Sequence, residues 1–166
     1  TSPTAAIAKL ILLDSAKIQE EEANKANEGQ YSKHQIAEPL YTVAQAEQVF
    51  SHFRVIQSKT VIPLDAEIQA VFSNAGHILG ACSIELHLEN QYLVFSGDIG
   101  RDNDVLLFPP TLPTRGDYLF LESTYGNRLH PDTDPKTVLE MYINNAIAKG
   151  GTVILPSFAV ERAQSV

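Results

Sequence analysis

The 166-residue chain carries 20 acidic and 12 basic side chains, and its formal net charge of −8 argues against a protein whose whole surface binds nucleic acid. Its single cysteine excludes an internal disulfide and fits a reducing cytoplasm. No apolar run approaches the roughly 20 residues that a membrane-spanning helix needs, so we expect a soluble cytoplasmic protein without membrane contacts. The chain opens at Thr1 without a methionine and stops inside a predicted helix, so we also expect a fragment of a longer protein.

The first part of the chain predicts two helices. Pro3 suits the first turn of one of them, and an apolar stripe follows at helical spacing: Ile7, Ile11 and Ile18. Asp14 falls on the same stripe, where a hydrogen-bonded carboxylate is favoured over a site residue. Thr42 with Gln45 makes a capping box that opens the second helix.

Beyond residue 55 the pattern changes to short β runs, over 60–64, 68–73, 83–88 and 92–96. The run 83–88 alternates apolar and polar residues, as a half-buried strand does, and Glu89–Gln91 turns the chain back. This hairpin would bring its two outer ends to one edge of a sheet. One end carries His77 and the other carries Asp98, each beside glycines that allow sharp turns.

The last third predicts a strand, a helix and a second strand. Residues 118–121 form an apolar strand ending at Glu122, and Asp134 caps a helix that Gly150–Gly151 ends. We expect five of its side chains to face inward: Leu139, Tyr142, Ile143, Ala146 and Ile147. A buried strand over 152–155 and the start of a helix follow. The succession of elements predicts an α/β fold.

His77, Asp98 and Glu122 each follow a predicted strand, so they are expected at a common sheet edge. An imidazole and carboxylates gathered in this way suit a hydrolytic metal site. A hydrogen-bonded histidine and an ordinary Ser-Gly-Asp turn would explain the same residues, and the pattern alone leaves both interpretations open. His87 lies inside the hairpin, where a surface role is favoured.

The motifs GHILGACS, FSGDIGR and LESTYGNRLH, in this order, resemble those of metallo-β-lactamase-fold nucleases of the β-CASP group, which includes the nuclease subunit of the cleavage and polyadenylation specificity factor. The early LILLDSAKIQEEEA and the late GGTVILPSFAVERAQ share the resemblance. It implies an α/β fold: residues 1–122 would be part of a metallo-β-lactamase αββα sandwich. Residues 123–166 would begin a β-CASP α/β domain.

The resemblance also implies residue roles. His77 would bind one zinc, Asp98 would bridge two zincs, and Glu122 would steady a later histidine at the active site. Ser157 and Arg162 fall in the stretch that faces RNA in such nucleases, although a plain turn with a surface arginine is an equal alternative. His130 matches a histidine often seen after ESTYG and is given no role beyond that of a groove residue.

The function implied for the intact protein is zinc-dependent hydrolysis of RNA phosphodiesters, with RNA as partner and a homodimer or an RNA-processing complex as the assembly. The family's His-x-His-x-Asp-His motif, which supplies most zinc ligands, is absent from this sequence, so residues 1–122 lack that part of the domain. We therefore expect two zincs in the intact site but weak or absent zinc, and no activity, in the fragment. Two alternatives stay open: a same-fold hydrolase of a small ester or thioester, and a non-catalytic scaffold subunit.

Overall fold

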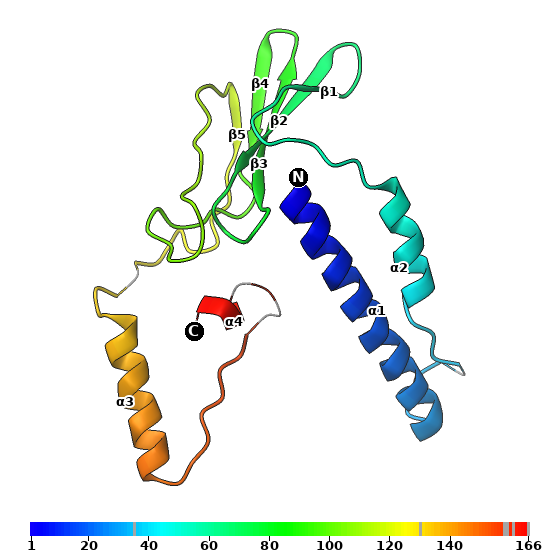
Figure 1. The fold of residues 1–166 in the computed structure, drawn as a ribbon, viewed down its shortest axis with the longest axis vertical. Helices are drawn as coiled ribbons and strands as arrows, with labels where there is room; N and C mark the ends of the chain where they lie inside the picture. Colours follow the sequence, from blue (N-terminus) through cyan, green and yellow to red (C-terminus); the bar gives the residue numbers. More distant parts are fainter. Residues whose placement is uncertain (35, 130, 158–159, 161, 166) are drawn as a thin grey trace. The chain divides into compact units, whose positions relative to one another are not determined.

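The computed structural model describes residues 1–34, 36–129, 131–157, 160 and 162–165. The chain divides into two compact units, Thr1–Leu121 and Glu122–Val166. Among the described residues, the first unit holds a sheet and two α-helices, and the second unit holds two further α-helices (Figure 1).

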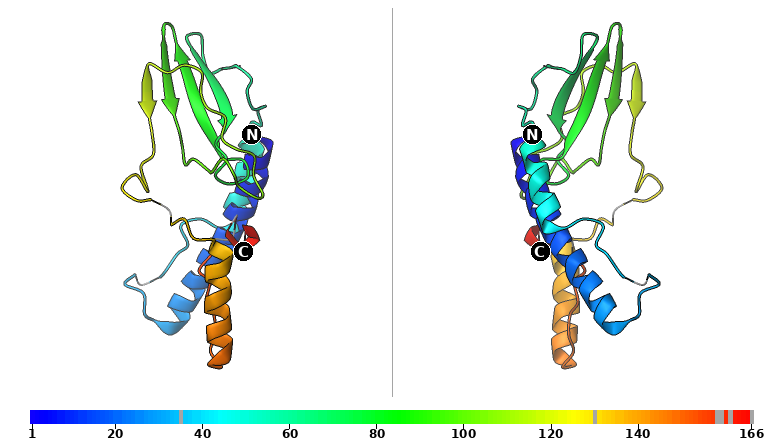
Figure 2. Two further views of the ribbon diagram at one scale, coloured as in Figure 1. Left: turned by 90° about the vertical axis from the view of Figure 1, so that its left-hand side faces the viewer. Right: turned by 90° about the vertical axis from the view of Figure 1, so that its right-hand side faces the viewer.

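The first unit is built on a five-stranded sheet in which the strands follow one another in chain order. Its strands are β1 (Ile62–Pro63), β2 (Ile68–Asn74), β3 (Cys82–Leu88), β4 (Gln91–Phe95) and β5 (Tyr118–Phe120). The first four pair antiparallel, and β5 adds parallel to β4 at the edge of the sheet (Figure 2). The predicted hairpin is thus confirmed as β3–β4, and Glu89 takes a left-handed φ of 42° at its turn.

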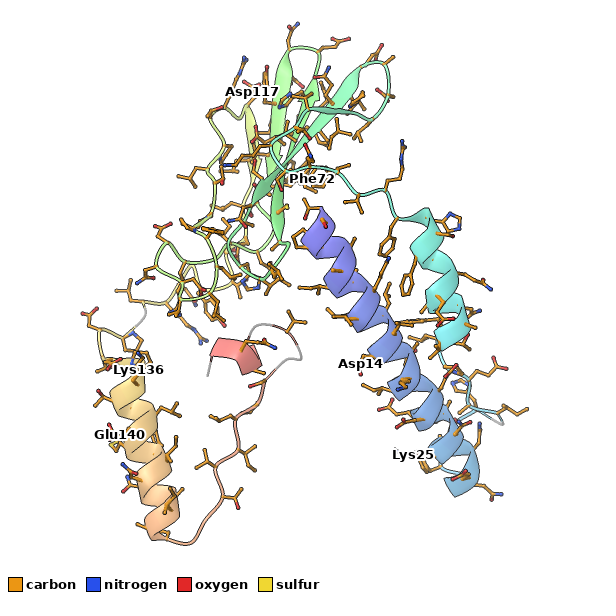
Figure 3. All side chains as sticks on the ribbon, viewed as in Figure 1. Asp14, Lys25, Phe72, Asp117, Lys136 and Glu140 are labelled. Carbon is orange, nitrogen blue, oxygen red and sulfur yellow. The ribbon has the colours of Figure 1, made fainter. Side chains whose placement is uncertain are left out.

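The core of the sheet is small and lies on its central strands. Val94 on β4 is 2% exposed and Ala70 on β2 is 1% exposed. Phe72, near the middle of β2 in Figure 3, pairs with Ile84 on β3, which in turn pairs with Phe95 on β4. The apolar positions of the alternating strands therefore line up across the sheet, as a period of two requires.

Helices α1 (Ser2–Gly29) and α2 (Val43–Val49) lie side by side, followed by a short 3-10 turn, η1 (Phe50–His52). The predicted capping box is confirmed, since the Thr42 hydroxyl accepts from the Gln45 N–H and the Gln45 side chain accepts from the Thr42 N–H. The isoleucines of the apolar stripe stay largely accessible, since Ile11 and Ile18 are 44% and 48% exposed, whereas Ala16 is fully buried.

Small side chains explain this packing. Alanine lets two helices approach closely, and the buried positions of α1 and α2 are all alanines: Ala16, Ala23, Ala26 and Ala46. Polar side chains of α1 then bind the segment that leads into α2. Asn27 exchanges hydrogen bonds with the backbone of Ala37, and Glu20 accepts from the Val43 N–H at 3.2 Å. Asp14 is exposed on α1 (Figure 3).

The second unit contains α3 (Pro135–Ala148) and α4 (Arg162–Ser165). Asp134 caps α3 as predicted, by accepting from the Lys136 N–H at 3.1 Å. Two expectations are wrong here. Tyr142 and Ile147, expected to face inward, are 61% and 68% exposed, and residues 152–155 form no strand, with Ile154 82% exposed.

Both errors have one physical cause. An apolar helix face or strand is buried only where a second layer covers it, and a strand also needs a partner for its backbone N–H and C=O groups. Within the described part of the second unit, no strand pairs with residues 152–155. The α/β class itself is confirmed. None of the described helices is both long and apolar enough to cross a membrane.

Candidate functional site

The loop that carries His77 closes the end of the β2–β3 ladder. Asn74, the last residue of β2, pairs with Cys82, the first residue of β3, so residues 75–81 must reverse the chain in a short span. Two backbone hydrogen bonds compact the loop, from the Ala75 N–H to the Ala81 carbonyl (3.0 Å) and from the Ala81 N–H to the Ile78 carbonyl (2.9 Å). The chain enters His77 through Gly76, whose φ of +69° strongly favours glycine.

The loop that carries Asp98 leaves β4 at the same edge. The Ser96 N–H is bonded to the Phe120 carbonyl of β5 (2.9 Å), which fixes the start of this loop to the sheet. Gly97, with a φ of +56°, then turns the chain before Asp98. Two residues later the Gly100 N–H donates to the Ala75 carbonyl (2.8 Å), which ties the Asp98 loop directly to the His77 loop.

The two loops bring the predicted pair together. The Nε2 atom of His77 lies 3.7 Å from the Oδ2 atom of Asp98. That separation is within ion-pair range and is too long for a hydrogen bond. The side chains are 42% and 70% exposed, so both ligand atoms can be reached from solvent. The hairpin register therefore places an imidazole nitrogen and a carboxylate oxygen side by side at an open rim.

This geometry suits two ligands of one zinc ion. Zinc binds histidine nitrogen and carboxylate oxygen at about 2.0–2.2 Å, so two ligands at a tetrahedral angle lie roughly 3.3–3.5 Å apart. The observed 3.7 Å needs only a small side-chain adjustment. Two ligands are fewer than the three or four of zinc sites in proteins. Over the described ranges, no group of three histidine, cysteine, aspartate or glutamate side chains could hold a metal.

The other predicted site residues lie in the second unit. Glu122, its first residue, is half-buried and accepts a hydrogen bond from the Thr124 hydroxyl at 2.8 Å. Ser157 is exposed, and its hydroxyl lies 3.4 Å from the Leu155 carbonyl. Arg162 begins α4, but its side chain lies outside what the structure describes, as does His130 altogether.

His87 belongs to a different cluster, within the β3–β4 hairpin. Its ring lies 4.6 Å from that of Tyr92, and its Nε2 atom lies 3.9 Å from a Glu85 carboxylate oxygen. Its side chain is 25% exposed, so it is more covered than the surface role predicted from the sequence. The Arg115 guanidinium lies over the Tyr92 ring, 4.2 Å from its centre. These contacts account for His87 without a ligand.

Sequence reasoning missed Asn74, which shapes the His77 loop. Its Nδ2 group donates to the carbonyls of Phe108 (3.0 Å) and Pro109 (2.9 Å), and its Oδ1 atom accepts from the Gly76 N–H (3.3 Å). An asparagine at the end of a β run gives no periodic signal. The predicted run ended at residue 73, so Asn74 fell just outside it, and its position carried no signal of this role.

No protein-family model matches the chain. Ribonuclease TTHA0252 of Thermus thermophilus is 32% identical over 130 residues, which cover 78% of this chain and 30% of the relative. Endoribonuclease YSH1 of Eremothecium gossypii is 32% identical over 168 residues, covering all of this chain and 21% of the relative. Endoribonuclease ysh1 of Schizosaccharomyces pombe is 31% identical over 168 residues, with 20% of the relative covered. The chain spans about a fifth to a third of the length of these relatives.

These matches define the class of protein that the chain resembles: each of the three relatives is named as a ribonuclease or endoribonuclease. More particularly, the matches confirm the resemblance to the metallo-β-lactamase-fold β-CASP nucleases that the motifs carry.

Proposed function

We propose that the complete protein containing this sequence is a zinc-dependent endoribonuclease that hydrolyses RNA phosphodiesters. The observation that carries the proposal is the convergence of His77 and Asp98, 3.7 Å apart at one rim of the sheet. Residues 1–122 would belong to the metallo-β-lactamase domain and residues 123–166 would begin the β-CASP domain. RNA is the proposed partner, the assembly would be a homodimer or an RNA-processing complex, and the cytoplasm is the proposed compartment.

His77 and Asp98 would hold the metal. His77 would bind one zinc through its Nε2 atom, and Asp98 would reach two zincs because a carboxylate has two oxygens to offer. A pair of zinc ions, when bound, would supply a water of lowered pKa and positive charge facing the phosphodiester. The described residues contain no third ligand beside this pair, so residues elsewhere in the complete protein would have to complete the site.

The names of the relatives favour RNA as the substrate. Each of the three is named as a ribonuclease or endoribonuclease, and none of them is named as a hydrolase of a small ester or thioester. We therefore favour RNA over a small-molecule substrate.

Glu122 would act through another side chain and would not touch the metal. Its carboxylate accepts a hydrogen bond from the Thr124 hydroxyl, which fixes one oxygen, and a carboxylate is the kind of acceptor that orients a histidine ring. That histidine would protonate the leaving oxygen of the RNA strand. Ser157 and Arg162 would contact the RNA backbone, through a hydroxyl and a guanidinium that suit phosphate oxygens.

Asp98→Ala in the complete protein tests the proposal. We expect RNA cleavage to be abolished while RNA affinity stays close to that of wild type, because Asp98 would hold metal and not the RNA chain. Asp102→Ala, at an exposed aspartate of the same loop, is the matched control and should cleave normally. Normal turnover by Asp98→Ala would refute the assignment, and wild-type protein that binds RNA without cleaving it would indicate the scaffold alternative.

A further inference from the structure

The two loops that carry His77 and Asp98 are clamped together by groups that would touch neither metal nor RNA. We propose that Asn74 and Gly100 are positioning residues: Asn74 fixes the path of the chain into His77, and Gly100 sets how closely the Asp98 loop approaches it. This inference rests on the proposed function, because it assigns these residues to the geometry of the same site.

Asn74 joins two segments of the chain, its own turn at 74–76 and residues 108–109, through one side-chain amide. Its Nδ2 group donates to the carbonyls of Phe108 and Pro109, at 3.0 and 2.9 Å, and its Oδ1 atom accepts from the Gly76 N–H at 3.3 Å. Its own backbone carbonyl accepts from the Thr111 N–H at 2.8 Å. Both polar ends of the amide are therefore used, and Asn74, three residues before His77, is anchored to the 108–111 segment.

The 108–111 segment also packs closely against Gly76. A Cβ atom on Gly76 would lie 3.0 Å from the Phe108 carbonyl oxygen and 3.0 Å from the backbone nitrogen of Pro110, closer than side chains normally approach. Gly76 is buried, and its left-handed φ of +69° adds strain for any other residue. The chain into His77 is thus packed against 108–110 at Gly76 and is bonded to the Asn74 side chain, which itself binds 108–109.

Gly100, in the Asp98 loop, makes the second contact between the two loops. Its N–H donates to the Ala75 carbonyl at 2.8 Å. A Cβ atom at this position would overlap the backbone carbonyl of Gly76 and would lie 2.7 Å from the His77 backbone nitrogen. The obstacle is backbone on both sides, which cannot swing away as the end of a long side chain can. Any residue larger than glycine would push the Asp98 loop away from His77.

The consequence is a preset separation between the two candidate ligands. Supporting residues that orient metal ligands typically contribute 10–100-fold to metal affinity or activity. A separation held by three side-chain hydrogen bonds and one glycine contact would not have to form on binding, so losing either element should weaken zinc binding even where the fold survives.

The experiment uses the complete protein with the variants Asn74→Ala and Gly100→Ala. Asn27→Ala is the matched control for the first, because Asn27 also joins two segments through its amide, bonding Ala37 at 2.9 and 2.7 Å, but in α1. Gly151→Ala is the control for the second, since a Cβ there would meet the Ala146 carbonyl at an ordinary 3.4 Å. Asn74→Asp, of nearly equal size, decides the question if Asn74→Ala fails to fold.

Two quantities are measured on each folded variant: zinc affinity, by competition with a chromogenic chelator, and amide hydrogen exchange of residues 75–77 and 98–100 in metal-free protein. We expect the Kd for zinc to rise about 10–100-fold in the Asn74 and Gly100 variants, with faster exchange in both loops. The controls should match wild type in both, even where Asn27→Ala lowers the melting temperature.

The outcomes separate this inference from the proposed function. Wild-type exchange rates at both loops in folded Asn74→Asp and Gly100→Ala would refute the proposal that Asn74 and Gly100 hold these loops in place, whatever the zinc affinity. Faster exchange with unchanged zinc affinity would show that Asn74 and Gly100 stabilise the loops without affecting metal binding, and would refute their role in the site. Wild-type protein that binds no zinc would refute the proposed function. The exchange data alone would then decide whether Asn74 and Gly100 hold the two loops in place.

Discussion

Replacing Asp98 with alanine should affect stability very differently with and without zinc. Among the described residues, Asp98 faces His77 at 3.7 Å, between side chains that are 70% and 42% exposed, and the two carry opposite charges only while His77 is protonated. Two unit charges at about 4 Å attract by about 1 kcal/mol in water, and exposed pairs measure about 0–1 kcal/mol. We therefore expect Asp98→Ala to change the free energy of unfolding by less than about 1 kcal/mol in the presence of a chelator.

Added zinc should stabilise wild-type protein much more than Asp98→Ala. At a zinc concentration of 100 times the wild-type Kd, binding stabilises the folded state by about 2.7 kcal/mol. Removing a ligand should weaken affinity by at least about 100-fold, the upper value for a merely supporting residue. The same zinc concentration would then stabilise Asp98→Ala by only about 0.4 kcal/mol.

The assay is urea unfolding of the complete protein, followed with chelator and with zinc, for wild type, Asp98→Ala and the control Asp102→Ala. Equal zinc-induced stabilisation of wild type and Asp98→Ala would refute the assignment of Asp98 as a ligand. A loss above about 2 kcal/mol in chelator would show instead that Asp98 is chiefly a structural residue, as the ordinary-turn interpretation holds.

Three further changes test the fold and the RNA contact. Val94→Ala should cost about 1.5–3 kcal/mol in urea unfolding, because Val94 is 2% exposed at the centre of the sheet, while Val105→Ala, at 95% exposure, should cost under about 0.5 kcal/mol; equal costs would contradict the described core. Thr42→Ala should cost about 1 kcal/mol and Thr42→Ser much less, since serine keeps the cap; an equal loss in both would discount the capping box. Arg162→Ala should weaken RNA binding and reduce its salt dependence by about one counterion, and an unchanged slope would exclude a phosphate contact.

The hairpin and the meeting of its two loops could be predicted because both follow from local pattern. The alternation in 83–88 fixes which side chains share a face, and the short turn at Glu89 fixes the register, so the outer ends must meet. This register and the glycines beside His77 and Asp98 predict that the two residues are neighbours, but they do not predict the contacts that set the distance between them. The Thr42–Gln45 cap was predictable for the same reason, since its bonds span three residues.

The errors and omissions concern contacts between segments distant in sequence. The apolar residues at 152–155 favour burial, but a strand also needs a partner strand for its backbone hydrogen bonds, which apolar composition does not supply. The burial of Ala16 and Ala46, rather than of Ile11 and Ile18, depends on how α1 and α2 pack together, which the spacing of apolar residues does not specify. The amide of Asn74 reaches residues 34 and 35 positions away, and no local rule predicts such a bond.

The most direct test of the central claim is a crystal structure of the complete protein grown with zinc, with anomalous diffraction recorded at the zinc absorption edge. We predict an anomalous peak about 2.0–2.2 Å from both the His77 Nε2 atom and an oxygen of Asp98. A zinc peak bound by other residues, with His77 and Asp98 left as a bare pair, would contradict it.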